Sequence, residues 1–140
     1  MVTRNNSTDS SKQNSSSDEP ASRVVIALGS NIGQRAAMDM ALRQLGGIVA
    51  GGRSTGAVWT EPIGMQSDRF LNCLFAGTTT MGLAELTAAT KDIERRCGRT
   101  AAEAAAGLIR MDIDILEYGG RRLRPADWER TYIKQLFEEI

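Results

Sequence analysis

The amino-acid sequence predicts an α+β fold, in which one antiparallel sheet carries helices on one face. Three observations support this prediction. Two runs, 24–28 and 109–116, are rich in β-branched residues. Two other segments, 34–45 and 83–97, place apolar residues at helical spacing. The 140 residues, of which 41% are hydrophobic and 24% charged, have the composition of one globular domain.

The first elements follow a polar N-terminal segment. Residues 1–22 are rich in Ser and Asn and contain no aromatic residue, so we expect a disordered tail and a folded domain over 23–140. The first strand ends in a tight loop, and a helix follows over 34–45. We expect Ser30 or Asn31 to cap its start, and the two glycines after it to stop it.

The middle of the chain predicts less regular structure. Residues 48–60 indicate a second strand that three glycines make irregular, followed by a loop over 61–68. Residues 70–79 mix apolar residues with threonine, which is typical of a strand. The second helix, over 83–97, is expected to end at Gly98.

The last third predicts one strand and one helix. Segment 99–107 holds five alanines and no long apolar residue, so we expect a mobile loop, with an alanine-rich helical turn as the alternative. The strand over 109–116 is followed by a turn at 118–120 and by a helix over 128–140. The order β-α-β-β-α-β is the ferredoxin-like arrangement, here with a short C-terminal helical addition.

Composition excludes several function classes. Because the chain has no histidine, it has no Ser-His-Asp triad, no His-ligated zinc and no imidazole base. A net charge of zero argues against a nucleic-acid partner held by bulk attraction. Cys73 and Cys97 alone make no disulfide framework. No apolar stretch suits a membrane helix and no signal peptide is evident, so we expect a cytoplasmic protein.

The strongest local motif is Arg110-Met111-Asp112-Ile113-Asp114. Because side chains alternate along a strand, Asp112 and Asp114 point to one face and their apolar neighbours to the other. Two adjacent carboxylates repel each other unless a positive group lies between them. A Mg²⁺ ion, which accepts one or two carboxylates together with phosphate oxygens, is one such group. The alternative is a solvated polar face with arginine partners.

Arginine accounts for 14 of the 17 basic residues, and guanidinium groups suit bidentate phosphate contacts. Arg95, Arg96 and Arg99 lie at the end of the second predicted helix, and Arg110 precedes the acidic pair. The alternative explanations are genome composition for the excess of arginine over lysine, and the helix dipole for the basic residues at the helix end. Glu94 has two interpretations, as an ion-pair partner and as an acceptor for a ligand.

Three short segments could border a binding pocket. The loop 29–33 joins a strand to a helix and offers backbone N–H groups to an anion, although most such loops only turn the chain. Segments 60–64 and 70–72 combine an aromatic wall with an amide. Asn72 lies in an otherwise apolar strand, where a buried amide needs partners, and an edge-strand position is the alternative.

Together and in order, five segments resemble the hydroxymethyl-dihydropterin pyrophosphokinases of folate biosynthesis. The resemblance covers Val24 to about Leu136. It rests on Ala27-Leu28-Gly29-Ser30-Asn31, Thr60-Glu61-Pro62-Ile63-Gly64, Phe70-Leu71-Asn72, Ile93-Glu94 with Gly98-Arg99, and Met111-Asp112-Ile113-Asp114-Ile115-Leu116.

The resemblance implies transfer of pyrophosphate from ATP to the hydroxymethyl group of 6-hydroxymethyl-7,8-dihydropterin, with release of AMP. It implies two Mg²⁺ ions, both ligated by Asp112 and Asp114, and catalysis mainly by positioning and charge neutralisation. We expect ATP and the pterin as partners, no nucleic acid, no membrane, and a monomer.

The resemblance also assigns roles by position. The catalytic set is Asp112, Asp114, Arg99 and Arg110. The pterin set is Thr60 and Asn72 at the pterin edge, Ile63 and Phe70 as lining, Tyr132 as the stacking aromatic, and Arg130 facing phosphate. The ATP set is Glu94, Arg99, Arg110 and Ile113.

The sequence departs from the family pattern in three places, which affect the expected phosphate contacts and leave the metal and pterin residues nearly complete. The arginine before the aspartates is displaced by one residue to Arg110, which then shares the parity of both aspartates. The loop 99–107 lacks the family's other arginines and its tryptophan, and Asp127-Trp128-Glu129 replaces a Pro-His segment. One alternative is a catalytically silent relative that binds pterin or nucleotide as a regulatory or assembly module. Another is a ferredoxin-like RNA-binding module, against which the balanced charge counts.

Overall fold

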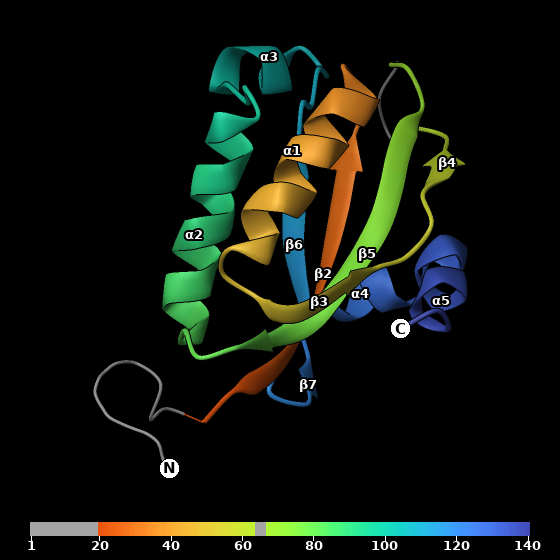
Figure 1. Ribbon diagram of the computed structural model, residues 1–140. Helices are drawn as coiled ribbons and strands as arrows, with labels where there is room; N and C mark the ends of the chain where they lie inside the picture. Colours follow the sequence, from red (N-terminus) through yellow and green to blue (C-terminus); the bar gives the residue numbers. More distant parts are fainter. Residues whose placement is uncertain (1–19, 64–66) are drawn as a thin grey trace.

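The computed structural model describes residues 20–63 and 67–140 (Figure 1). Most of the predicted tail, 1–22, and positions 64–66 of the predicted loop lie outside the described residues. The strands are β2 (Ser22–Ser30), β3 (Ala50–Ser54), β4 (Val58–Thr60), β5 (Phe70–Thr79), β6 (Asp112–Tyr118) and β7 (Arg121–Arg122). The helices are α1 (Gln34–Gly46), α2 (Leu83–Arg96), α3 (Ala101–Ala105), α4 (Pro125–Trp128) and α5 (Thr131–Phe137).

Within the described residues, six strands form one sheet in the order β3-β5-β2-β6-β7, and β4 pairs with another part of β5. The central strand, β2, runs antiparallel to both β5 and β6. Helices α1 and α2 connect the strands of the β-α-β-β-α-β series. The predicted α+β, ferredoxin-like fold is therefore confirmed.

One face of the sheet packs against α1 and α2 (Figure 1). Every second residue of β2, β5 and β6 points to this side, and the apolar stripes of the two helices cover them. The strands contribute Val24, Ile26, Leu28, Leu71, Cys73, Phe75, Ile113 and Ile115, and the helices contribute Ala37, Met38, Ala41, Leu45, Leu86 and Ile93. The helical spacing read from the sequence thus marks the buried side of both helices.

The opposite face has an apolar cluster of its own, which α4 and α5 cover (Figure 1). It contains Val25, Leu74, Leu116, Trp128, Ile133 and Leu136. The expectation that helices cover only one face is therefore too simple. The single helix predicted over 128–140 is two short helices, because the chain bends at Arg130 to fit both against the sheet.

Three further elements differ from the sequence-based expectation. The irregular strand predicted over 48–60 is two separate strands, and a Cβ at Gly52 would lie 2.2 Å from Cζ of Phe75, so β3 passes directly over that ring. The mobile loop expected over 99–107 is wrong, and the alternative of a helical turn is confirmed as α3. Its N-cap is Thr100, whose hydroxyl accepts the N–H of Glu103. The strand predicted from 109 begins at Asp112.

No helix in the described part of the chain combines the length and the apolar character that spanning a bilayer requires.

Candidate active site

A cavity of about 590 Å³ lies on the side of the sheet that faces α4 and α5. It is bordered by β2, β4, β5 and β6 on the sheet side and by the C-terminal helices on the other. The structure brings together here all six residues assigned to the pterin and both aspartates: Thr60, Ile63, Phe70, Asn72, Arg130, Tyr132, Asp112 and Asp114. Segments more than 70 positions apart in sequence therefore border one space.

Gly29 forms the centre of the cavity floor. In the register of the sheet it lies opposite Asn72 of β5 on one side and Asp112 of β6 on the other. A Cβ at Gly29 would approach Asn72 Oδ1 to 3.0 Å and a ring carbon of Phe70 to 3.6 Å. The absence of a side chain at Gly29 therefore keeps the floor open between an amide and a carboxylate.

The side-chain amide of Asn72 makes its hydrogen bonds through the NH₂ group. Its Nδ2 donates to Thr60 Oγ1 at 2.8 Å and to the carbonyl of Phe70 at 3.2 Å. Among the described residues no donor reaches Oδ1, and the Thr60 hydroxyl keeps its own proton to donate. The pair thus presents one acceptor and one donor at the edge of the cavity, although Asn72 itself is 5% exposed.

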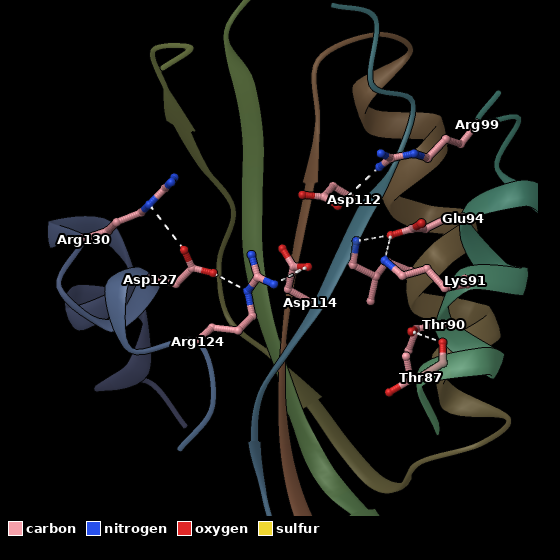
Figure 2. A network of polar contacts seen from close by, with 11 residues as sticks. Thr87, Thr90, Lys91, Glu94, Arg99, Asp112, Asp114, Arg124, Asp127 and Arg130 are labelled. Carbon is pink, nitrogen blue, oxygen red and sulfur yellow. Dashed lines mark hydrogen bonds and ion pairs between the residues drawn. The ribbon is translucent and has the colours of Figure 1, made fainter. Parts of the chain in front are cut away.

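The two aspartates behave differently although they are neighbours on β6. Asp112 pairs with Arg99, whose Nη1 lies 3.3 Å from its Oδ1 and also donates to the carbonyl of Met111 (Figure 2). Asp114 is more buried, and burial together with the charge of Asp112 raises its pKa to about 6, although Arg124 at 3.6 Å opposes this shift. Ionising both carboxylates on one face costs free energy because the two negative charges repel each other. A divalent cation bound between them would remove this repulsion.

No cluster of three or more acidic or cysteine side chains suited to a metal ion forms within residues 20–63 and 67–140. A cation held by Asp112 and Asp114 would therefore take its remaining ligands from water and from a bound phosphate. That is the usual coordination of Mg²⁺ at phosphate-transfer sites, and it requires no further acidic residue.

Arg110 does not join the aspartates in the cavity. Because β6 begins at Asp112, Arg110 precedes the strand, and the parity argument that placed it on the carboxylate face is wrong. Its Nε and Nη2 donate to the two carboxylate oxygens of Glu103 at 2.8 and 3.0 Å. This pairing attaches α3 to the start of β6 and lowers the pKa of Glu103.

Glu94 and Ile113, both assigned to the nucleotide, lie on the helix-covered face of β6 (Figure 2). Glu94 is 4% exposed, and its Oε2 accepts the backbone N–H of Ile113 at 2.7 Å and the Lys91 ammonium at 3.2 Å. The short strand β7 pairs only with Glu117 and Tyr118 of β6, so it does not reach the backbone N–H of Ile113. Glu94 supplies the acceptor that this N–H needs. It fixes the residue between the two aspartates.

We predict that Glu94→Ala lowers the free energy of unfolding by about 2 kcal/mol, because the buried N–H of Ile113 loses its acceptor. Glu94→Gln keeps an acceptor oxygen and is expected to cost less than half as much. Urea denaturation measures both. Equal stability of the Ala variant and the unmodified protein would contradict this role for Glu94.

Sequence reasoning missed Arg124 and Asp127, which line the cavity. It also misread Asn31, because α1 starts after Gly33, whose φ is 58°, and neither Ser30 nor Asn31 caps it. Asn31 Nδ2 instead donates to the carbonyl of Gly107 at 2.8 Å, and its Oδ1 accepts the N–H of Ile109 at 2.7 Å. No local pattern signals a bond across 76 positions.

The strand order and the cavity define a ferredoxin-like domain with an amide and a hydroxyl at one end of the cavity and paired carboxylates at the other. Residues 25–140 match the 7,8-dihydro-6-hydroxymethylpterin-pyrophosphokinase (HPPK) family. The chain belongs to this family, which confirms the resemblance seen in the sequence.

Two relatives from Arabidopsis thaliana are similar to the chain. It is 37% identical over 122 residues to a mitochondrial folate synthesis bifunctional protein, covering 79% of this chain and 22% of that protein. It is 33% identical over 121 residues to a second folate synthesis bifunctional protein, covering 79% of this chain and 25% of that one. The chain thus spans a quarter or less of these curated relatives. The cytoplasmic location and the monomeric state expected from the sequence stay predictions.

Proposed function

We propose that the chain is a 2-amino-4-hydroxy-6-hydroxymethyldihydropteridine diphosphokinase. It would transfer the diphosphate of ATP to the hydroxymethyl group of 6-hydroxymethyl-7,8-dihydropterin and release AMP. Family membership supports this proposal. The observation that carries it is the row Asn72–Gly29–Asp112 across three strands, which sets a hydrogen-bonding edge and an acidic edge on either side of an open floor.

The pterin would lie at the Asn72 end of the cavity. Asn72 Oδ1 suits a ring N–H or amino donor, and the Thr60 hydroxyl suits a ring acceptor. Phe70 and Tyr132, from opposite walls, offer ring surfaces to a flat heterocycle. With its ring held there, the hydroxymethyl group would extend over Gly29 toward the aspartates.

Asp112 and Asp114 would hold Mg²⁺, which when bound neutralises charge on the phosphate oxygens of ATP. Arg99 keeps Asp112 in place, and Glu94 fixes the backbone between the two carboxylates. In the proposed transfer the hydroxymethyl oxygen bonds to the β-phosphorus and releases its proton to solvent water, while the bond from the β-phosphorus to the α–β bridging oxygen breaks and that oxygen leaves as part of AMP. The chain's residues orient the two substrates, as expected for phosphoryl transfer without a histidine base.

The direct test incubates the protein with ATP, Mg²⁺ and the hydroxymethyl pterin and separates the nucleotides by chromatography. We expect AMP and the pterin diphosphate in equal amounts, and no AMP when the pterin is omitted. Asp112→Ala is expected to remain folded and to form no AMP. The proposal would be refuted if the unmodified protein is folded and forms no AMP, and if Asp112→Ala behaves in the same way.

The alternative is a catalytically impaired relative that binds pterin or nucleotide as a regulatory or assembly module. The pairing of Arg110 with Glu103 favours it, because this arginine is then turned away from the cavity in the structure. Calorimetry separates the two functions, since an impaired relative binds pterin or ATP but produces no AMP under the same conditions.

We predict that Asn72→Ala weakens pterin binding at least tenfold and changes ATP binding less than twofold, because only the pterin end loses its hydrogen bonds. Titration calorimetry with each ligand measures both. Gln34→Ala is the matched control, since it removes an exposed amide outside the cavity that donates to the carbonyl of Arg69. If Asn72→Ala weakened pterin binding and ATP binding equally, the assignment of the Asn72 end of the cavity to the pterin would be contradicted.

A further inference from the structure

Arg124 places a positive charge inside the cavity, against one of the two aspartates. Its Nη1 lies 3.6 Å from Asp114 Oδ1, and its Nε donates to Asp127 Oδ2 at 2.5 Å (Figure 2). Arg130 approaches the other oxygen of Asp127, with Nε 3.8 Å from Oδ1. The four residues form an alternating chain of charges from β6 to the C-terminal helices.

The backbone at Arg124 is held in an unusual conformation. With φ 52° and ψ 62°, Arg124 is the one non-glycine residue with positive φ among those the structure describes. L-residues with a Cβ rarely adopt this region, and such conformations concentrate at functional sites. Trp128, anchored by its indole N–H to the carbonyls of Leu116 and Leu123, holds the segment around Arg124 against the sheet. The fold therefore constrains where this guanidinium lies.

The position of Arg124 has an electrostatic consequence for cation binding. Arg99 accompanies Asp112, whereas Arg124 accompanies Asp114, so each carboxylate already has a positive partner. A divalent cation bound to Asp114 competes with Arg124 for the charge of the same carboxylate. Because Asp127 binds the opposite edge of the guanidinium, Arg124 can leave Asp114 without leaving the cavity. Its freed N–H groups would then face the cavity, where the proposed function places the phosphates of ATP.

We propose that Arg124 is a positioning residue: it neutralises Asp114 while the cavity is empty and passes to a phosphate group of the ligand when a divalent cation takes Asp114. This inference rests on the proposed function, in which Asp112 and Asp114 hold the cation. Its consequence is coupling between ligands. The protein binds a free divalent cation weakly, and binds it well only together with a polyphosphate that accepts the displaced guanidinium.

The test measures binding of Mn²⁺ alone, by electron paramagnetic resonance of the unbound ion, to the full chain. Removing the competing charge in Arg124→Gln is expected to tighten Mn²⁺ binding roughly fivefold, while weakening binding of the Mg²⁺ complex of a non-hydrolysable ATP analogue by a similar factor. Arg124→Lys retains the charge and is expected to bind Mn²⁺ as the unmodified protein does. The matched control is Arg121→Gln, which removes an exposed arginine on β7 outside the cavity.

The outcomes separate this inference from the proposed function. If Asp114→Asn abolishes Mn²⁺ binding but Arg124→Gln leaves it unchanged, Arg124 does not compete for the carboxylate and the inference is overturned. If Asp114→Asn has no effect on Mn²⁺ binding, the cation does not use the acidic pair, and the proposed function fails as well. Thermal unfolding of each variant establishes that it is folded, and the Lys variant tests the charge with the side chain's length retained.

Discussion

Asp114→Asn is expected to reduce Mg²⁺-dependent AMP formation at least a thousandfold and, at the same time, to raise the melting temperature. The loss follows because the proposed cation site would keep one carboxylate of its two. The gain follows because burial and the charge of Asp112 raise the pKa of Asp114 to about 6. At neutral pH the ionised carboxylate thus destabilises the empty protein, and a neutral amide removes that cost.

The sign of the pH dependence follows from the same shift. The folded protein binds the Asp114 proton more tightly than the unfolded chain, whose group keeps its ordinary pKa of 3.8. This residue's contribution to stability is therefore complete below that value and is lost as pH rises through about 6. Above pH 7 the Asn variant is expected to gain about 1 to 2 kcal/mol, or about 4–8 °C in melting temperature. The gain should shrink as pH falls below 6.

Scanning calorimetry without metal between pH 4 and pH 8 measures this effect. The matched control is Asp92→Asn, which alters an exposed carboxylate paired with Arg95 and Arg96 on α2 and should change stability little. A melting temperature for Asp114→Asn that falls at pH 8 would show that the ion pair with Arg124 outweighs the burial cost.

Trp128→Ala is expected to lower the stability of the fold and to weaken ligand binding in the cavity. Trp128 is 5% exposed, and its indole N–H donates to two carbonyls at 3.0 Å. Its ring meets that of Phe137 edge-on at 5.0 Å, and Arg122 lies over its face at 3.9 Å. Truncation is expected to lower the free energy of unfolding by about 3–5 kcal/mol.

The chain offers a matched control in its other tryptophan. Trp59 is 40% exposed, and the guanidinium groups of Arg35 and Arg69 lie 5.7 and 5.1 Å from its ring centroid, so Trp59→Ala is expected to cost less than about 1 kcal/mol. Urea denaturation measures both variants. Because Arg130 lies between α4 and α5 and Tyr132 lies on α5, Trp128→Ala should also weaken pterin binding, whereas Trp59→Ala should not. Similar destabilisation by the two variants would contradict the role given to Trp128.

Much of the fold could be predicted because its signals are local. The apolar stripes of α1 and α2 repeat at helical spacing. Strands β2 and β5 are runs of strand-forming residues bounded by glycine or polar residues. The alternation in Asp112-Ile113-Asp114 correctly placed both carboxylates on one face and Ile113 on the other. These features depend on neighbours within a few positions, which a sequence displays directly.

The parts that sequence reasoning missed depend on partners far along the chain. The parity rule failed for Arg110 because Glu103 pairs with it before the strand begins. The loop 99–107 was misread because its alanines have no apolar pattern, while the Thr100 cap and the Arg110 pair hold α3 in place. Arg124 was missed because neither its backbone conformation nor its aspartate partners form a motif.

The amino acids alone determined the order of helices and strands, the acidic pair on one face of its strand, and the family to which the chain is similar, because each is written in short-range pattern. Only the tertiary structure decided which groups share the cavity. It set Gly29 between Asn72 and Asp112, turned Arg110 away from the aspartates, and brought Arg124 against Asp114. Such contacts arise from strand register and from the packing of α4 and α5, which join segments whose spacing in sequence carries no signal.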